Sequence, residues 1–263
     1  MKVWTLANQK GGVGKTTSAV SLGGLLASWG FKTLMMDIDP HGSLTSYFRY
    51  DPDTIENSSY SLFESVMTKQ DIEPISLVQP TGIEGLDLLP ASVALATLDR
   101  QAGHQEGMGL VLKNSVRGLA SHYDHILIDC PPMLGVLLIN ALAACEQLLI
   151  PVQTEFLALK GLERMLHTLR MVLRARTEIL PHLIIPTMFD RRTRASIDSL
   201  KVLRSQHADA IWEGVIPVDT RFRDASRAGI PPSYFDPHSR GVGTYAALLE
   251  KLQRGTPAMQ VAG

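Results

Sequence analysis

The stretch ANQKGGVGKTT, Ala7 to Thr17, decides the fold of this chain. It follows a short apolar run, residues 3–8, and precedes apolar residues at helical spacing that end at Gly30. A strand, a glycine-rich turn and a helix opening with Lys-Thr are the context of a phosphate-binding loop, because glycines let successive N–H groups converge on phosphate oxygens. The start of the helix adds its positive dipole end. The stretch therefore predicts a nucleotide site.

Within this loop, we expect Lys15 to neutralise charge on the β- and γ-phosphates of ATP and Thr16 to offer its hydroxyl to Mg²⁺. The standard pattern has a glycine five residues before Gly14, where this chain has Gln9. A second lysine, Lys10, lies in the same loop. The predicted nucleotide-binding residues of the loop are Gly11, Gly12, Val13, Gly14, Lys15, Thr16 and Thr17.

This form of the loop, KGGVGKT, resembles that of the deviant Walker A ATPases, the family of ParA and MinD. The resemblance makes Lys10 the signature lysine that reaches a nucleotide bound in the partner subunit. Since Lys15 occupies the inner face of the cradle, a lysine at the outer lip most easily serves a second site that faces it. Such a cation would act as arginine fingers do, which increase the rate of nucleotide hydrolysis ~10³–10⁵-fold. We expect an ATP-dependent homodimer; the alternative is that Lys10 is a solvated surface charge.

Carboxylates lie at the ends of two apolar runs: Asp37 ends TLMMD and Asp39 follows it, and Asp129 ends HILID. In a parallel sheet, such strand ends share a rim with the phosphate loop. The resemblance assigns to Asp39 the orientation of the attacking water and to Asp129 a water-mediated contact with Mg²⁺, whereas Asp37 can be purely structural. The sequence shows no general base of shifted pKa, so we expect slow, partner-stimulated ATP hydrolysis. The predicted catalytic residues are Lys10, Lys15 and Asp39, and the predicted metal residues are Thr16, Asp39 and Asp129.

Continuous apolar runs separated by helical patterns predict an α/β fold of the P-loop NTPase type, with a mostly parallel twisted sheet and helices on both faces. We expect one domain over residues 1–263, with segment 49–82 as an insertion or irregular connection. The further predicted strands are 33–37, 86–90, 125–129, 147–152, 182–189 and 211–217, and the further predicted helices lie near 108–121, 156–176, 194–207 and 240–254.

The composition, 45% hydrophobic and 19% charged, is typical of a soluble globular protein. The two cysteines lack CxxC spacing, so neither a disulfide framework nor a zinc site is expected. No apolar run approaches the ~20 residues that a membrane-spanning helix needs. We expect a cytoplasmic protein, at the cell pole or on the nucleoid.

The net charge of −1 conceals a basic portion, Lys160–Arg227, in which thirteen Lys and Arg face eight Asp and Glu. Such a patch can hold DNA phosphates without reading sequence. ParA-type ATPases use comparable residues for non-specific DNA binding, and the alternative is a solvated basic face. The predicted DNA-binding residues are Arg191, Arg192, Arg194, Arg221 and Arg223.

The resemblance to ParA covers most of the chain, including residues 150–166 and 186–198. It assigns adenine contacts to the surroundings of Pro217. His41 stands where most ParA proteins have glutamine, a variant that resembles the ParA-like ATPases encoded among chemotaxis genes, sometimes called ParC. We therefore expect a dimerisation switch that positions chemotaxis arrays at the pole with a stimulating or adaptor protein. The alternatives are plasmid or chromosome partitioning and, in another class, a metabolic ATP-dependent enzyme.

Overall fold

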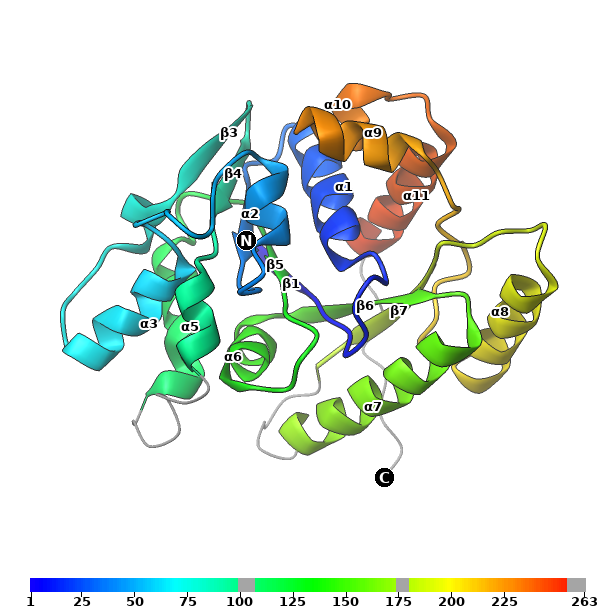
Figure 1. The fold of residues 1–263 in the computed structure, drawn as a ribbon, viewed down its shortest axis with the longest axis horizontal. Coiled ribbons are helices and arrows are strands. Elements are labelled where there is room, and N and C mark those ends of the chain that lie inside the picture. The colour runs from blue at the N-terminus through cyan, green and yellow to red at the C-terminus, as the bar shows by residue number, and fades with distance from the viewer. Residues whose placement is uncertain (99–106, 174–179, 255–263) are drawn as a thin grey trace.

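The computed structural model describes residues 1–98, 107–173 and 180–254. Their centre is a seven-stranded sheet in the order β3-β4-β2-β5-β1-β6-β7 (Figure 1). Neighbouring strands of this sheet are parallel except β3 and β4, which are antiparallel. The predicted α/β fold with a mostly parallel sheet is confirmed. The strands are β1 (Lys2–Leu6), β2 (Thr33–Asp37), β3 (Gln79–Ile83), β4 (Leu86–Leu89), β5 (His125–Asp129), β6 (Gln147–Gln153) and β7 (His182–Thr187).

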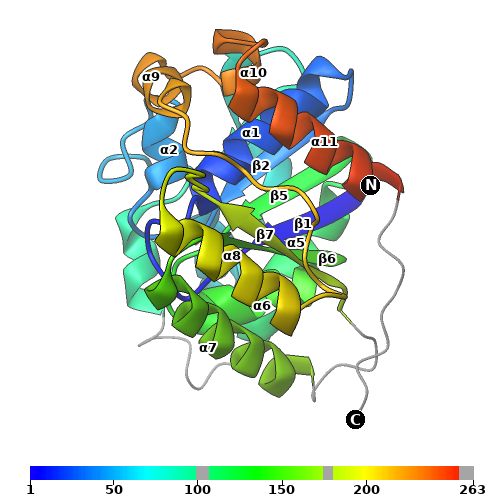
Figure 2. The same cartoon turned by 90° about the vertical axis from the view of Figure 1, so that its right-hand side faces the viewer.

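Helices cover both faces of the sheet (Figures 1 and 2), which explains why its parallel strands are apolar along their length. Successive strand residues alternate between two cores, so that Val3 packs in one and Trp4 in the other. One core includes α1 (Lys15–Ser28) and α11 (Arg240–Arg254). The other includes α3 (Ser59–Thr68), α5 (Val111–Gly118), α6 (Val136–Ala144) and α7 (Phe156–Leu173).

The remaining helices complete the described chain, in which no helix is long and apolar enough to cross a membrane. They are α2 (Ser43–Tyr47), α8 (Arg194–Gln206), α9 (Arg221–Ala228) and α10 (Pro232–Phe235), together with the 3₁₀ helices η1 (Pro74–Leu77), η2 (Val93–Thr97) and η4 (Met108–Leu110). The predicted helix 156–176 is confirmed as far as Leu173, and its last predicted residues lie outside the described ranges.

The predicted strand at 211–217 is wrong. This segment pairs with the β7 side of the sheet only through isolated bridges, from Ile184 to Ile211 and from Phe189 to Pro217. Pro186 of β7 has no N–H to donate, so the ladder cannot run continuously along this edge. Between the bridges the buried Trp212 folds against Gly214, where an added Cβ would lie 2.4 Å from the indole ring.

Two regions contain more regular structure than their sequence predicted. Segment 49–82, expected as an insertion or irregular connection, includes α3, which begins with a capping box between Ser58 and Ser61, and most of the edge strand β3. Helix α6 was not predicted at all, because VLLINALAA is apolar on nearly every side and shows no helical period. In both regions the helix is stabilised by packing against the core, although the local sequence pattern predicts it only weakly.

The register of the central strands aligns their carboxyl ends. Asp129 of β5 is level with Leu6 of β1 on one side and with Asp37 of β2 on the other. The loop that follows β1 and the carboxylates that end β2 and β5 therefore share one rim of the sheet. Open α/β sheets bind ligands at this rim.

The opposite rim holds a buried histidine, His125, whose ring packs edge-on against Trp4 and Phe31 with centroids 5.3 and 4.9 Å away. Its Nε2 accepts a 2.9 Å hydrogen bond from the Gln253 side chain, which in turn accepts one from Lys2 Nζ at 2.8 Å. Burial, reinforced by the charge of Lys2, lowers the pKa of His125 to about 4 although nearby Asp124 opposes the shift. The folded protein therefore keeps this ring neutral at neutral pH.

The pKa of His125 predicts an acid-sensitive core. Between pH 6.5 and about 4 the unfolded chain binds a proton at His125 that the folded chain does not, so the free energy of unfolding falls as pH falls through this range. Denaturant unfolding at pH 7 and near pH 4.5 should show a smaller loss of stability for His125→Gln than for the parent. The exposed His122→Gln serves as control, and equal losses in all three proteins would contradict the assignment.

Candidate active site

The glycine-rich loop between β1 and α1 has the geometry of a phosphate cradle. Gly12 and Gly14 adopt left-handed φ angles of 73° and 91°, which glycine tolerates best. A Cβ added at Gly11 or Gly12 would meet no atom within 4 Å, so the loop presents bare backbone to an open space. The first turn of α1 has no side-chain cap and no acidic residue, which leaves its N–H groups available to an anion.

Val13 anchors this loop to the sheet. Its side chain is fully buried, and its carbonyl oxygen accepts a 2.8 Å hydrogen bond from Thr187 Oγ1 at the end of β7. Among the predicted loop residues, Val13 therefore shapes the cradle from below. Sequence reasoning could not distinguish this role from direct phosphate contact.

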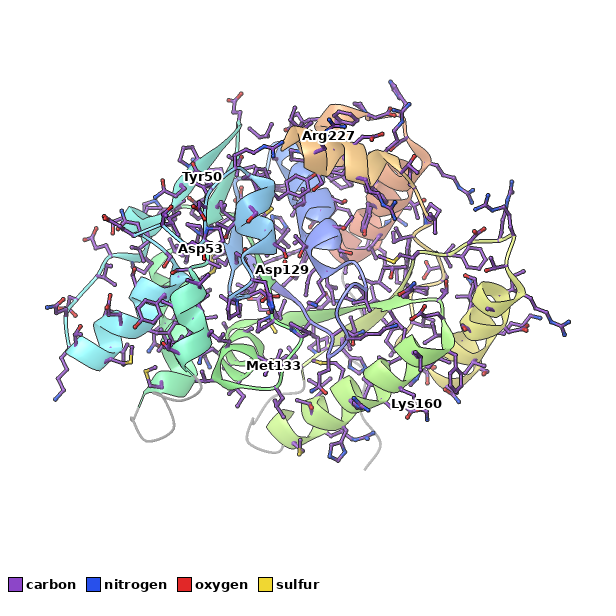
Figure 3. The ribbon with its side chains drawn as sticks, viewed as in Figure 1. Tyr50, Asp53, Asp129, Met133, Lys160 and Arg227 are labelled. Atoms are coloured by element: carbon purple, nitrogen blue, oxygen red, sulfur yellow. The ribbon has the colours of Figure 1, made fainter. Side chains whose placement is uncertain are left out.

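Thr16 and Asp129, predicted to share a Mg²⁺ site, are in contact. Thr16 Oγ1 donates a 2.6 Å hydrogen bond to Asp129 Oδ2, although 113 positions separate the two residues. Asp129 lies at the end of β5, deep in the centre of the molecule (Figure 3). Its second oxygen, Oδ1, is buried and has no hydrogen-bond partner in the described chain. An oxygen in this state is a ready acceptor for a ligand's cation or water.

The electrostatics of this rim indicate a deficit of positive charge. Burial raises the pKa of Asp129 to about 8, helped by the neighbouring charge of Asp37 and opposed by Thr16 and Lys15. Burial likewise raises the pKa of Asp37 to about 6. A bound divalent cation would relieve this cost, so the donor set fits Mg²⁺. Because the described residues hold no group of three or more His, Cys, Asp or Glu that could bind a metal alone, phosphate oxygens and waters would complete its ligands.

Asp37 has a structural role. Its Oδ2 accepts hydrogen bonds from both the N–H and the hydroxyl of Thr45, at 2.8 and 2.7 Å. Its Oδ1 accepts one from the N–H of Asp39 at 3.1 Å. Asp37 thereby fastens the segment from Asp39 to α2 against the end of β2.

Asp39, the predicted catalytic carboxylate, lies in the same cavity as the loop. The cavity has a volume of about 560 Å³ and includes Lys15, Thr16 and His41 in its lining. Oδ1 of Asp39 accepts hydrogen bonds from the backbone N–H of His41 at 3.0 Å and interacts with its Nδ1 at 2.8 Å. The structure therefore brings the predicted groups Lys15, Thr16 and Asp39 to one space.

A larger cavity of about 710 Å³ adjoins the first, and Pro217, the predicted adenine contact, is in its lining. Gly14, Thr17, Met188 and Phe222 line both cavities, so a nucleotide could extend from one to the other. Sequence reasoning missed Met188 and Phe222. Met188 lies in a left-handed conformation with φ of 52°, which is uncommon for a non-glycine residue and which no local pattern announces.

Lys10 is absent from the lining of both cavities. Its Nζ instead forms an ion pair with Glu155, the residue before α7. The backbone N–H of Lys10 donates a 3.1 Å hydrogen bond to Asn8 Oδ1. The chain thus holds its second loop lysine away from its own predicted phosphate site.

The predicted DNA-binding arginines differ in how far acidic neighbours neutralise them. Arg192 pairs with Asp190 at 2.8 Å, and its hydrogen bonds hold the pKa of Asp190 at about 2. Arg194 lies 3.5 Å from Asp198, and Arg221 lies 3.2 Å from Asp236. Within the described ranges, Arg191 and Arg223 form no ion pair, and Arg223 also lines the larger cavity.

Comparison with known proteins agrees with this geometry. A family model described as an AAA domain matches residues 1–181. The sporulation initiation inhibitor protein Soj of Bacillus subtilis is 36% identical over 252 residues, covering 95% of this chain and 98% of Soj. The chromosome partitioning protein ParA of Myxococcus xanthus is 34% identical, covering 97% of this chain and 89% of that protein.

Among solved structures, this chain is similar to a cobyrinic acid a,c-diamide synthase from Mycobacterium smegmatis with a bound ATP analogue and magnesium. The TM-score is 0.80 at 31% identity, covering 97% of this chain and 95% of the other. The phosphate cradle, the paired Thr16 and Asp129 and the extent of these matches lead to one conclusion: the chain belongs to the ParA/Soj family of P-loop ATPases.

Proposed function

We propose that this protein is a slow, partner-stimulated ATPase that dimerises on binding ATP and thereby positions a cellular cargo. The observation that carries the proposal is the division of labour between the two loop lysines. Lys15 is nearly buried and lines the cavity with Thr16, whereas Lys10 lies outside the cavities of its own chain. A cation in this position is best placed to contact a nucleotide bound in a second subunit.

In this proposal ATP and Mg²⁺ occupy the two adjoining cavities. The free N–H groups of the loop and Lys15 hold the phosphates, and Thr16 and Asp129 hold the cation. Mg²⁺ supplies charge neutralisation at the phosphates when it is bound. Asp39 orients the attacking water through its carboxylate, and Pro217 and Phe222 border the base. Such machinery works by position and charge, which favours slow hydrolysis.

Exposed apolar side chains near the loop support a dimer across this rim. Met133 (labelled in Figure 3) and Leu134 follow β5 and are 65% and 47% exposed. Phe156 and Leu157, which follow β6, are 69% and 67% exposed. Exposed apolar side chains at one end of a sheet are typical of an interaction site, because their burial against a partner is energetically favourable. A second copy of the chain, lending its Lys10, would cover them.

Substitution of Lys10 by alanine should abolish the ATP-dependent dimer while monomeric nucleotide binding stays within about twofold. Removal of one partner of a buried charge contact costs ~2 kcal/mol or more, and each dimer contains two such contacts, so dimer affinity should fall at least about a thousandfold. Sedimentation velocity with a non-hydrolysable ATP analogue and Mg²⁺ measures the dimer. Lys160→Ala, an exposed lysine paired with Glu163, is the matched control. A dimer unaffected by Lys10→Ala would disprove the role in trans.

We propose that the basic portion of the chain binds DNA phosphates. This surface would attach the ATP-bound dimer to DNA. Arg191 lies in the loop before α8 and Arg223 lies on α9. Both carry charges that acidic side chains of the described chain leave unneutralised. A dimer doubles these contacts, so DNA binding should require ATP.

The double substitution of Arg191 and Arg223 by alanine should weaken binding of random-sequence duplex DNA and flatten its dependence on salt. Each phosphate contact contributes about one unit to the slope of log affinity against log salt, so the dimer should lose about two to four units. Fluorescence anisotropy over a salt series measures the slope. Nucleotide affinity is measured in parallel because Arg223 lines a cavity, and Arg254→Ala on α11 is the control. An unchanged slope would refute this surface.

Two cargoes fit the switch. The name of the Myxococcus xanthus relative, a chromosome partitioning protein, supports a chromosome or, as another DNA molecule, a plasmid. The histidine at position 41, by its resemblance to the chemotaxis-associated subgroup, supports a chemoreceptor array at the cell pole. In either case an adaptor protein would link cargo to dimer and stimulate hydrolysis.

Fluorescent fusions in the native cell distinguish these cargoes. An array-positioning protein should form a focus at the pole, and a partitioning protein should move over the nucleoid. Lys15→Ala should disperse either pattern, because it removes the main phosphate contact. An even distribution of both parent and variant would contradict a positioning function.

The metabolic alternative has one point in its favour, the similarity to a structure named as a synthase. A groove of about 380 Å³ beside Asp39 is the natural place for a second substrate. It is lined by mainly apolar residues, among them Pro40, Val93, Leu95 and Met133, and its lining in the described chain includes neither Lys nor Arg. An acidic substrate would find neither a lysine nor an arginine in this lining, which supports the switch over the metabolic enzyme.

A further inference from the structure

The side chain of Lys10 is held along α7 by an ion pair with Glu155. The two residues lie 145 positions apart, so the contact depends on the tertiary fold. The Lys10 side chain is 25% exposed and that of Glu155 is 40% exposed. The pair is therefore accessible enough to open, and sheltered enough to persist while no stronger anion competes.

The backbone under Lys10 is fixed from two sides. Asn8 Nδ2 donates a 2.8 Å hydrogen bond to the carbonyl of Pro151 in β6. Gln9 Nε2 donates one of 2.6 Å to Thr168 Oγ1 on α7. Because these contacts hold the outer lip of the loop, the Lys10 side chain can change its direction without a change in the phosphate cradle.

Helix α7 is shaped to receive this side chain. A Cβ added at Gly161 would lie 3.0 Å from Lys10 Cβ and 3.4 Å from Asn8 Oδ1. Even a Cβ at this position would require the Lys10 side chain to shift by a few tenths of an ångström. The glycine thus allows Lys10 to lie against α7, where Glu155 can reach its ammonium group.

We propose that Glu155 is a positioning residue that latches Lys10 in the monomer and so sets the threshold for dimer formation. The inference rests on the proposed function, in which Lys10 binds the partner's nucleotide. To reach it, Lys10 must leave Glu155. A triphosphate carries several negative charges against the single charge of Glu155, so it draws Lys10 away when a second loaded subunit presents it. The latch opposes dimerisation without ATP.

The first test measures the latch in the nucleotide-free monomer, where dimerisation plays no part. Acylation of lysine amines, followed by mass spectrometry, should modify Lys10 several-fold faster in Glu155→Gln than in the parent. Glu155→Asp, which keeps the charge, should restore part of the protection. Glu163→Gln is the matched control, since it frees Lys160 on α7 and should leave Lys10 unchanged. Equal Lys10 labelling in Glu155→Gln and the parent would overturn the latch.

The second test measures the consequence for assembly. With a non-hydrolysable ATP analogue and Mg²⁺, Glu155→Gln should dimerise about five- to thirtyfold more tightly, because each dimer opens two modest ion pairs. A dimer equal to or weaker than the parent's would overturn the threshold role. The proposed function fails separately: if Lys10→Ala dimerises normally, the trans contact is refuted while the labelling result still reports the latch. Glu155→Ala repeats both measurements if the glutamine variant folds poorly.

Discussion

The site depends on one constraint, the burial of carboxylates at the ends of two adjacent parallel strands. Asp129 and Asp37 lie level in the sheet and are almost fully removed from water. Such burial is costly unless positive charge or hydrogen bonds compensate it. Thr16 compensates one oxygen of Asp129 and leaves the other without a partner. This desolvation destabilises the nucleotide-free protein. It also makes the binding of a cation together with phosphate favourable at this rim.

The buried carboxylate of Asp37 differs from that of Asp129, because hydrogen bonds within the protein satisfy both of its oxygens. Thr45 and the backbone of Asp39 donate to its two oxygens, and Thr45 Oγ1 also accepts from the N–H of Ala91. The segment that carries Asp39 is thereby tied to the core at both its start and its end. Asp39 can respond to a ligand in the cavity, whereas its anchor cannot move without breaking buried hydrogen bonds.

The two loop lysines show how one short loop can serve two sites. Lys15 begins α1 and points into the chain's own cavity, where backbone N–H groups converge. Lys10 lies five residues earlier and is directed to α7, where Gly161 makes room for it and Glu155 pairs with it. The loop therefore binds within one subunit and offers a cation to another, and the proposed latch links these two functions.

The sequence by itself determined the α/β class, the phosphate loop and the strand-end carboxylates, because glycines, apolar runs and their spacing act locally. It did not reveal α6, whose uniform apolarity has no period. It also predicted a strand at 211–217, where Pro186 on a neighbouring strand prevents a continuous ladder. Only the tertiary structure decided which distant groups meet: Met188 and Phe222 beside the loop, and Glu155 against Lys10. These contacts join elements far apart in the chain, and no local pattern encodes a partner that folding alone brings near.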